Sequence, residues 1–462
     1  MKTPDIMIGL EVHIQLDTKT KLFCSCSTKA HAPNTSVCPV CLGHPGSKPV
    51  LNKKTVEFGV MLGLALNCDI LPAINFSRKT YFYPDMSKNY QITQYEVPLA
   101  QKGKIALDSG KEISISRLHL EEDPASLEHK DEFSLVDYNR SGIPLIELVT
   151  EPVMNTPDEA REFMKKLLGI LRYLKIFDMT EGTVKADANV SIKESNFSRV
   201  EIKNITGFRE IERAIEYEVQ RQREAVKKNE KIVRETRGWD APQGITRPQR
   251  LKETEEDYGY IFDPDLVTIS ITAAFKKSVA EKLPELPVKK SARFVKQFKI
   301  DAVDSQVISA DPEVAAMFEE VAKKANPILS AHWIRRELLK ILSTKSLAES
   351  KITSQHLAEL FILIDKKAIT QRTGQEIMQK LGEKPFSPKD FVEKHGLSAV
   401  ADSHELEKLC ADAVKENPSA VKDYLAGEEK AFNFLVGKVM AKTKGRARPD
   451  IITPIIKKLV KK

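Results

Sequence analysis

Cysteine and long apolar runs are both scarce in this chain of 462 residues, and each scarcity excludes a class of proteins. Six cysteines are too few for a disulfide-stabilised scaffold of this length. No stretch approaches the roughly 18 apolar residues that span a bilayer. Glu11 and His13 interrupt the apolar run from Ile6 to Leu16, which a signal peptide would not tolerate. We therefore expect a cytoplasmic protein that makes no contact with a membrane.

Familiar phosphate-binding loops are missing as well. The chain contains neither a Gly-x-x-x-x-Gly-Lys-Ser/Thr loop nor a Gly-x-Gly-x-x-Gly pattern. It also lacks a Gly/Ser-rich amidase signature and a convincing Cys–His nucleophile pair. Any nucleotide must therefore be held in another way, and the chain itself is not expected to act as an amidase.

Composition is that of an ordinary globular protein, with 41% apolar and 30% charged residues. The net charge of +7 is mild, but basic residues are concentrated after Met440, where Asp450 is the single acid. Such a segment can neutralise nucleic-acid phosphates, or it can serve only as a solubilising surface. Its basic residues are Lys442, Lys444, Arg446, Arg448, Lys457, Lys458, Lys461 and Lys462.

Periodicity changes along the chain. Up to the segment Leu283–Pro287 the sequence mostly alternates as β-strands do, with helical periodicity in residues 157–177 and 207–228. Beyond that segment almost everything is typical of amphipathic helices. We expect an α+β domain over residues 1–287, an all-α helical domain over residues 288–400 and a small helical tail domain over residues 401–462.

Four cysteines have the spacing of metal ligands. Cys24 and Cys26 form one close pair, and Cys38 and Cys41 form another. Thiolates at this spacing can surround zinc as a tetrahedron and leave no open position for a substrate, so such an ion would be structural. The alternative is four reduced thiols or a redox pair. The remaining two cysteines are expected in hydrophobic cores.

Acidic residues recur on the predicted strands. Alternation in residues 10–16 puts Glu11 and His13 on one face, and residues 113–121, 143–151 and 184–192 show related patterns. If these strands are neighbours, the side chains can hold divalent cations that clamp ATP phosphates. The alternative is the solvated face of an antiparallel sheet. The candidate catalytic residues are Glu11, His13, Glu121, Glu122, Glu147 and Asp187, with His13, Glu122 and Glu147 as metal ligands.

Nucleotide contacts have weaker support. His13 is an unusual ligand for Mg²⁺, so Mn²⁺ or Zn²⁺ at that position stays open. Basic residues near the acidic segments can bind phosphate, although each can equally be a surface or ion-pair residue. Tyr83 lies in the aromatic segment 81–85, which either walls an adenine pocket or belongs to the core. The basic candidates are Arg78, Lys79, Lys88, Arg117 and Arg140.

Several motifs occur in the order that is typical of one protein family. They are Ile8-Gly9-Leu10-Glu11-Val12-His13, Tyr81-Phe82-Tyr83-Pro84-Asp85, Tyr90-Gln91-Ile92, Leu118-His119-Leu120-Glu121-Glu122-Asp123, Leu135-Val136-Asp137-Tyr138-Asn139-Arg140, Pro144-Leu145-Ile146-Glu147, Asp187-Ala188-Asn189-Val190-Ser191, Phe432-Asn433-Phe434-Leu435-Val436-Gly437 and Gly445-Arg446-Ala447-Arg448-Pro449. Over nearly its whole length the chain thus resembles the B subunits of the tRNA-dependent amidotransferases.

The resemblance implies a fold, a reaction and partners. The fold is a cradle domain like that of glutamine synthetase, built on an antiparallel sheet. With ATP and Mg²⁺, the side-chain carboxylate of Glu on tRNA(Gln) or Asp on tRNA(Asn) becomes an acyl phosphate, and ammonia then displaces phosphate. An amidase, the A subunit, together with a small third protein, the C subunit, completes a heterotrimer with an ammonia channel. The tail domain contacts tRNA, with Lys442, Lys444, Arg446, Arg448, Lys457 and Lys458 as candidates.

Two other functions compete with this one. The chain can be a non-catalytic tRNA-binding scaffold with a structural zinc, in which the strand carboxylates are only surface. It can also be a stand-alone amide ligase for a small molecule, which the helical tail disfavours. Addition of RNase to an amidation assay separates a tRNA substrate from a small molecule.

Overall fold

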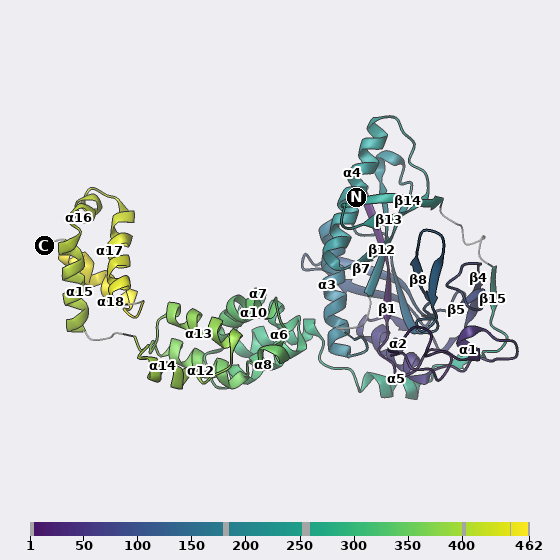
Figure 1. Ribbon diagram of the computed structural model, residues 1–462, viewed down its shortest axis with the longest axis horizontal. Helices are drawn as coiled ribbons and strands as arrows, with labels where there is room; N and C mark the ends of the chain where they lie inside the picture. Colours follow the sequence, from purple (N-terminus) through teal and green to yellow (C-terminus); the bar gives the residue numbers. More distant parts are fainter. Residues whose placement is uncertain (1–3, 179–183, 252–258, 400–402, 444, 461–462) are drawn as a thin grey trace. The chain divides into compact units, whose positions relative to one another are not determined.

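The computed structural model describes residues 4–178, 184–251, 259–399, 403–443 and 445–460 (Figure 1). The chain divides into two compact units between Leu286 and Pro287. A large sheet with a few helices forms the first unit, whereas the second is helical. The mixed α+β class expected from periodicity is therefore confirmed. The predicted strands at residues 10–16, 113–121, 143–151 and 184–192 are all present.

A nine-stranded sheet is the frame of the first unit. Its neighbouring strands are antiparallel, as expected, except for one parallel pair between β12 and β13. In central strand β1 the even-numbered apolar residues from Ile8 to Ile14 are fully buried, whereas Glu11, His13 and Gln15 are only half-buried. From edge to edge the sheet contains β14 (Ile245–Leu251), β13 (Glu235–Asp240), β12 (Val200–Thr206), β11 (Val184–Ile192), β1 (Ile6–Gln15), β10 (Pro144–Thr150), β7 (Glu112–Glu122), β6 (Ala100–Ala106) and β2 (Asp69–Ile70).

Three helices cover one face of this sheet: α2 (Lys53–Ala65), α3 (Pro157–Leu174) and α4 (Phe208–Lys227) (Figure 1). Their apolar sides join those of the strands in one core. Helix α3 begins after Thr156, whose hydroxyl accepts the backbone N–H of Glu159. Both helices predicted by periodicity are present. The opposite face of the sheet is left for polar side chains.

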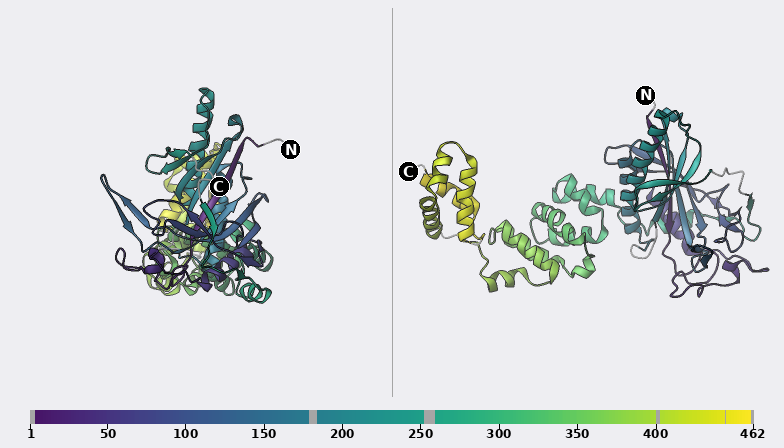
Figure 2. Two further views of the ribbon diagram at one scale, coloured as in Figure 1. Left: turned by 90° about the vertical axis from the view of Figure 1, so that its right-hand side faces the viewer. Right: turned by 45° about the horizontal axis from the view of Figure 1, so that its top comes forward.

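Smaller elements surround the main sheet. The β8–β9 hairpin projects from the first unit (Figure 2). Strands β15, β4 and β5 form a second sheet, and β16 pairs with β3. Their bounds are β3 (Ala73–Ile74), β4 (Ser77–Thr80), β5 (Tyr90–Thr93), β8 (Ser126–His129), β9 (Ser134–Asp137), β15 (Gly259–Phe262) and β16 (Ile269–Ser270), with helices α1 (Pro39–Leu42) and α5 (Ala273–Ala280).

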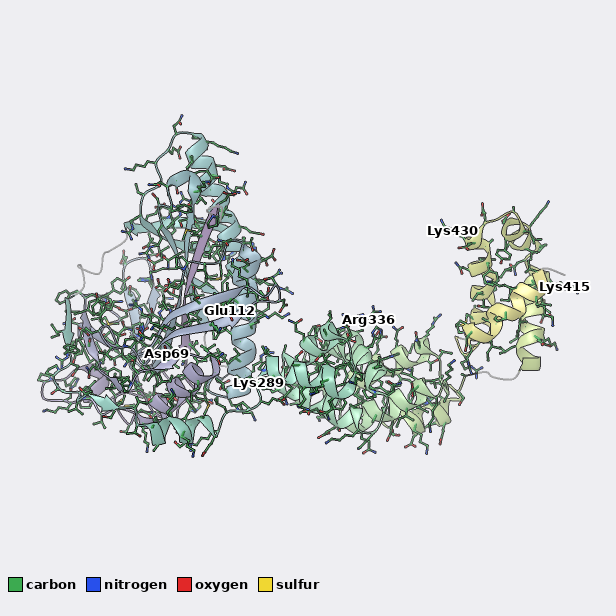
Figure 3. All side chains as sticks on the ribbon, turned by 180° about the vertical axis from the view of Figure 1, so that it is seen from behind. Asp69, Glu112, Lys289, Arg336, Lys415 and Lys430 are labelled. Atoms are coloured by element: carbon green, nitrogen blue, oxygen red, sulfur yellow. The ribbon has the colours of Figure 1, made fainter. Side chains whose placement is uncertain are left out.

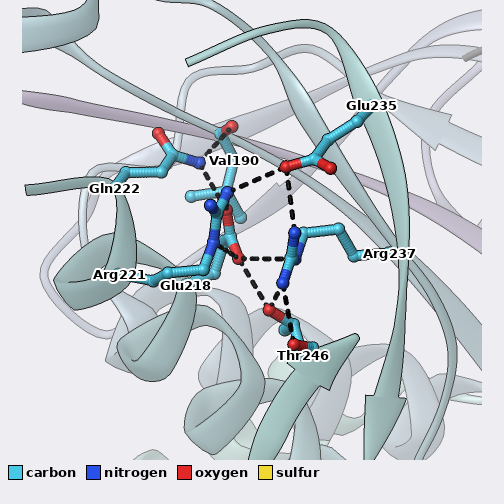
Figure 4. A network of polar contacts seen from close by, with 7 residues as sticks. All are labelled: Val190, Glu218, Arg221, Gln222, Glu235, Arg237 and Thr246. Atoms are coloured by element: carbon cyan, nitrogen blue, oxygen red, sulfur yellow. Dashed lines mark hydrogen bonds and ion pairs between the residues drawn. The ribbon is translucent and has the colours of Figure 1, made fainter. Parts of the chain in front are cut away.

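A buried polar network fixes α4 to the sheet (Figure 4). The fully buried carboxylate of Glu218 accepts hydrogen bonds from Arg221, Gln222 and Thr246 at 2.7–2.9 Å. Gln222 also donates to the Val190 carbonyl of β11. Val190 belongs to β11 and Thr246 to β14, so the network holds α4 in register with these two strands. The strands that carry the polar face are thereby kept in a fixed order.

The second unit contains two separate clusters of buried apolar residues. The first cluster runs from Phe294 to Val392 and the second from Leu406 to Val460. A division of this unit near residue 400 remains a prediction. Among the described residues, no helix is both long and apolar enough to cross a bilayer. Its helices are α6 (Pro287–Phe298), α7 (Ala302–Ser309), α8 (Pro312–Ala322), α9 (Pro327–Trp333), a π-helical turn (Ile334–Leu338), α10 (Leu339–Leu342), α11 (Leu347–Ser350), α12 (Ser354–Asp365), α13 (Gln371–Glu383), α14 (Pro388–His395), α15 (Ser403–Glu416), α16 (Pro418–Leu425), α17 (Glu429–Lys442) and α18 (Pro449–Val460).

Candidate functional site

Strand register gathers acidic residues and histidines in the middle of the large sheet. His13 of β1 lies opposite Glu147 of β10, which in turn lies opposite His119 of β7. On the other side of β1, Glu11 lies opposite Asp187 of β11. Directly opposite residues project from the same face of a sheet, so these five side chains share the face that the helices leave uncovered.

His13, His119, Glu121 and Glu147 form a first set, which we call the histidine group. His13 Nε2 lies 3.5 Å from a carboxylate oxygen of Glu121 and 3.5 Å from one of Glu147. His119 Nε2 lies 3.2 Å from the same Glu147 oxygen and 3.8 Å from Glu121. One ligand atom from each of His13, Glu121 and Glu147 fits within 4.8 Å of the others. Three of the predicted residues therefore meet.

The charges of this group are coupled. Burial disfavours the charged form of His13, but its hydrogen bond to Glu147 and the negative charges of Glu147, Glu121 and Asp187 outweigh burial and raise its pKa to about 10. Burial likewise opposes a charge on His119, yet Glu147 and Glu121 raise its pKa to about 9. The two histidines hold the pKa of Glu147 well below its usual range, although burial acts in the opposite direction. Protonated imidazoles would thus offset the negative charge of the neighbouring carboxylates.

Glu11, Asp187, Glu201 and Lys203 form a second set, which we call the lysine group. Ligand oxygens of its three acids also lie within 4.8 Å of one another. The Lys203 ammonium lies 2.8 Å from Asp187 and 3.3 Å from Glu201. Burial lowers the pKa of Lys203, but the charges of Asp187 and Glu201 more than offset this and raise it. Burial and neighbouring acids raise the pKa of Glu11.

The donor set of the histidine group suits a divalent cation. One imidazole nitrogen together with carboxylate oxygens is a suitable ligand set for Mn²⁺. Mg²⁺ prefers oxygen ligands, which the carboxylates provide. The buried Nδ1 of His119 has no hydrogen-bond partner among the described residues, so its ring is not committed to a structural role on that side. His13, Glu121 and Glu147 are therefore the residues that would hold the ion.

Cation binding to this group should release a proton. With a pKa of about 10, His13 is protonated near neutral pH, and its nitrogen can ligate only after the proton has left. We expect release of about one proton per Mn²⁺ and an affinity that falls about tenfold for each pH unit of acidification. Calorimetry in two buffers of different ionisation enthalpy measures the proton. His13→Gln is the matched control and should release none, and buffer-independent heats for the natural chain would contradict the assignment.

Glu122 is not brought to the histidine group. It directly follows Glu121 and therefore projects from the opposite face of β7. Its carboxylate accepts the backbone N–H of Ile92 at 2.8 Å and forms a buried ion pair with Lys88. The positive charge of Lys88 is thereby already neutralised. The metal-ligand role of Glu122 and the nucleotide contact of Lys88 remain predictions.

The predicted basic residues lie in different surroundings. Arg117 shares the polar face of β7, and its buried Nε has no hydrogen-bond partner in the described part of the chain. Arg140 donates from Nε to the Pro124 carbonyl at 2.9 Å. Arg78 forms an ion pair with Asp263 at 2.9 Å. Of these arginines, Arg117 is the one whose placement best fits an anionic ligand.

The aromatic segment lies at the surface. Phe82 is 83% exposed and Tyr83 is 50% exposed, so the alternative that this segment belongs to the core is wrong for both. Lys79 lies on β4, where its ammonium is 5.9 Å from the Tyr81 ring centroid. Exposed aromatic faces can receive a planar ring by stacking.

The four cysteines predicted as ligands meet. Their sulfur atoms all lie within 4.8 Å of one another, as a tetrahedral ion requires. Lys21 is fully buried beside them, with its ammonium 3.6 Å from the Cys41 sulfur and 2.8 Å from the Ser36 carbonyl oxygen. In the described part of the chain no carboxylate forms an ion pair with it. A buried ammonium needs an anion, and four thiolates around one Zn²⁺ carry a net negative charge. Lys21 therefore favours a metal-bound cluster over four neutral thiols.

The remaining cysteines and the tail also follow the sequence in part. Cys68 and Cys410 are buried in cores, as expected. Arg446 donates to the Gly396 carbonyl at 2.9 Å, Arg448 pairs with Asp450 at 2.6 Å and Lys442 pairs with Glu416 at 2.8 Å, whereas Lys457 and Lys458 are exposed on α18. The predicted contact at Lys444 lies outside the described residues.

Several site residues were not assigned a role from the sequence. His119 alternates with Arg117 and Glu121 in the sequence, so this alternation could have identified it as a residue of the polar face. Glu201 and Lys203 alternate in the same way on β12, but that strand attracted no prediction. Lys21 carried no sequence signal beyond its place between β1 and the cysteines.

Comparison with known proteins identifies the family. Residues 6–277 match the GatB/GatE catalytic domain, and residues 316–460 match the GatB domain. The B subunit of aspartyl/glutamyl-tRNA(Asn/Gln) amidotransferase from Thermotoga maritima is 43% identical over 98% of both chains. The protein of that name from Persephonella marina is 43% identical over 98% of this chain and 99% of its own, and that from Thermoanaerobacter pseudethanolicus is 41% identical over 99% of both. The chain therefore belongs to the GatB family of tRNA-dependent amidotransferase B subunits.

Proposed function

We propose that this chain uses ATP to amidate Glu on tRNA(Gln), Asp on tRNA(Asn), or both. The side-chain carboxylate attacks the γ-phosphorus of ATP, ADP leaves, and an acyl phosphate forms. Ammonia then attacks the acyl carbon, loses a proton and expels inorganic phosphate to leave the amide. Phosphorylation is needed because a carboxylate is a poor acyl electrophile and oxide is a poor leaving group.

The convergence of His13, Glu121 and Glu147 is the observation that carries this proposal. The carboxylate and the triphosphate are both anions, so their approach is unfavourable unless positive charge lies between them. A divalent cation held by these residues would offset the charge on the triphosphate. Arg117, on the same face with an unpartnered Nε, would add a fixed positive charge beside it.

Other predicted residues take supporting roles in this proposal. Tyr83 offers an exposed ring against which adenine can stack, and Lys79 lies on β4, just before this aromatic segment. Arg140 would orient the segment after β7 through its bonds to backbone carbonyls. The polar face, the second sheet and the hairpin would together form the concave cradle that a glutamine-synthetase-like fold provides.

Partners follow from the chemistry that the chain lacks. The relatives are named as B subunits, which supports an assembly of several different chains. We propose that an amidase, the A subunit, supplies ammonia and that a small third protein, the C subunit, makes up a heterotrimer. Ammonia would reach the polar face through a channel, because free ammonia is largely protonated near neutral pH. Zinc in the cysteine cluster would be structural.

Reconstitution of the heterotrimer tests the function. It should convert Glu-tRNA(Gln), Asp-tRNA(Asn), or both to the amide with glutamine, ATP and Mg²⁺, and release ADP in equal amount. RNase should abolish amide formation, because the substrate is esterified to tRNA. RNase-resistant amidation would instead identify a small-molecule ligase, and tRNA binding without ADP release would identify a scaffold.

The exposed lysines of α18 should contribute to tRNA affinity. Lys415 and Lys430 of the neighbouring helices also project outward (Figure 3). We expect Lys457→Ala with Lys458→Ala to weaken tRNA binding and to lower the slope of log affinity against log salt by about 1 per lysine. Filter binding over a salt series measures both.

A matched pair of lysines provides the control for this change. Lys276 and Lys277 are adjacent and exposed on α5 of the first unit. Their replacement by alanine removes the same charge and should leave the salt slope unchanged. Equal effects of the two double variants would show that the tail acts only through net charge.

A further inference from the structure

A segment outside the sheet fastens the end of β7. Glu121 is the next-to-last residue of β7, and regular pairing with β10 stops one residue later. Beyond that point the backbone N–H of Asp123 donates to the Ile143 carbonyl at 2.8 Å, and that of Gly142 donates to the Asp123 carbonyl at 2.9 Å. Both partners belong to residues 138–143, which join β9 to β10 and which we call the connecting segment. The end of β7 therefore depends on how this segment is held.

The loop that carries the four cysteines holds the connecting segment. We call residues 24–41 the cysteine loop. Asn139 accepts the backbone N–H of Ser36 through Oδ1 at 2.7 Å and donates from Nδ2 to a second backbone carbonyl of this loop at 2.6 Å. The hydroxyl of Ser141, which is buried, donates to the carbonyl of Cys41 at 3.3 Å. Two side chains of the connecting segment thus bind the cysteine loop, and one of them binds a cysteine.

The cysteine loop also contacts the connecting segment through its own side chains. Asn34 accepts the backbone N–H of Tyr138 at 2.7 Å and donates to the Val136 carbonyl at 3.0 Å. Its φ of 58° lies in the left-handed region, which asparagine adopts more readily than most residues. The Lys21 ammonium bridges the two parts, because it donates to the carbonyls of Ser36 at 2.8 Å and Tyr138 at 3.2 Å. A movement of the loop would therefore move the segment.

Gly142 shows how closely the connecting segment is enclosed. A Cβ atom at this position would lie 3.7 Å from Cys41 Cβ and 3.8 Å from Glu122 Oε2, both ordinary van der Waals distances. The segment thus lies directly between a cysteine of the cluster and the last residue of β7. A displacement of the cysteine loop reaches the end of β7 through this single layer of residues.

We propose that Asn139 and Ser141 are positioning residues, which fix Glu121 on the polar face by tying the connecting segment to the cysteine loop. The β8–β9 hairpin cannot do this alone, because an isolated two-stranded hairpin is only marginally stable. The cysteine loop then sets the geometry of the candidate site as well as the stability of the first unit. This inference rests on the proposed function for the part that Glu121 plays, whereas the tie itself can be measured without amidation.

Hydrogen exchange on the full chain tests the tie. Asn139→Ala and Ser141→Ala keep all four cysteines, so the zinc content of both variants should equal that of the natural chain. The backbone N–H groups of Asp123 and Gly142, which neither side chain contacts, should exchange about 3- to 10-fold faster, as loss of a typical hydrogen bond allows. Ser278→Ala is the control, since it removes the same hydroxyl from an exposed position of α5 and should change neither rate.

Kinetics of the reconstituted heterotrimer test the positioning role. Per folded chain, Asn139→Ala should lower kcat for amidation about tenfold, as loss of an outer partner of a metal ligand does. The KM for aminoacyl-tRNA should stay within about twofold, because the tail surface is unchanged. Asn139→Asp keeps the acceptor for the Ser36 N–H and should recover part of the rate. Ser278→Ala should retain the natural kcat and KM.

Three results would overturn the proposal. Exchange at Asp123 and Gly142 that is unchanged in both variants would show that the tie does not hold the segment. Faster exchange with the natural kcat would show that the tie is only structural, and an Asn139→Asp rate no higher than that of Asn139→Ala would exclude the Asn139 acceptor. Failure of the proposed function looks different: the natural heterotrimer then forms no amide and the role of Glu121 falls with it, while the exchange rates still decide whether the tie exists.

Discussion

Glu147→Gln should lower ATP-dependent amidation by at least about 100-fold, since loss of even an outer partner of a metal ligand typically costs 10–100-fold. The substitution keeps the size of the side chain and removes the charge that both His13 and His119 contact. Without that negative charge the histidine group binds a cation less tightly, and the positive charge of its protonated imidazoles is no longer offset. Amide formed on Glu-tRNA and ADP released are the two quantities to measure. Both should fall together, because one site activates the carboxylate.

A neighbouring acid supplies the control for this result. Glu151 follows β10 and is exposed, so Glu151→Gln removes the same charge without touching the histidine group. It should leave the rate within about twofold, as surface substitutions usually do. Binding of tRNA should survive in both variants, since the basic surface of the tail is unchanged. Full activity of Glu147→Gln would show that the Glu147 carboxylate takes no part in catalysis.

The polar face was predictable because alternation is a local property. Glu11, His13, Glu121 and Glu147 occupy positions whose apolar neighbours point into the core, and a half-buried strand leaves no other arrangement. The sequence did not predict that these residues converge, because the order of strands in a sheet is set by contacts between residues far apart in the chain. Strand β1 lies between β10 and β11, and no local pattern indicates that order.

Glu121 and Glu122 show how strand alternation separates neighbouring residues of one motif. Consecutive residues of a strand project from opposite faces, so Glu121 and Glu122 could not both join one cluster unless a bulge intervened. The alternation that placed Glu121 correctly already placed Glu122 elsewhere, against Lys88. Lys203 shows the reverse case, since its position beside Asp187 depends on a bulge between β11 and β12. A one-residue irregularity of this kind leaves little trace in a pattern of apolar and polar residues.

The cysteine cluster was predictable from spacing, but its electrostatic setting was not. Four sulfurs within 4.8 Å follow from two close pairs joined by a loop. Lys21 becomes relevant only because the loop folds over it and the segment around residue 138 closes beside it. A lysine is usually exposed, so nothing in the sequence indicated that Lys21 is buried. Full burial of Lys21 is the observation that distinguishes an anionic cluster from neutral thiols.

Cys41→Ala should destabilise the first unit by about 3–5 kcal/mol, because it removes a metal ligand and leaves the Lys21 ammonium buried without an anion. For a unit of this size such a loss lowers the melting temperature by roughly 10 °C. Zinc content measured by elemental analysis should fall from one equivalent to none. Cys68→Ala is the control, since Cys68 is buried in the core of the same unit, and it should keep its zinc.

Lys21→Met tests the charge of the cluster itself. If the sulfurs are thiolates around Zn²⁺, removal of the ammonium leaves their negative charge without its buried counter-ion, so zinc should be lost to a chelator faster and the unit should be less stable. If the sulfurs are neutral thiols, the ammonium is an uncompensated buried charge, and methionine would relieve its desolvation at the cost of two carbonyl contacts. Stability that is unchanged or improved, with no zinc to lose, would therefore favour reduced thiols over the metal site.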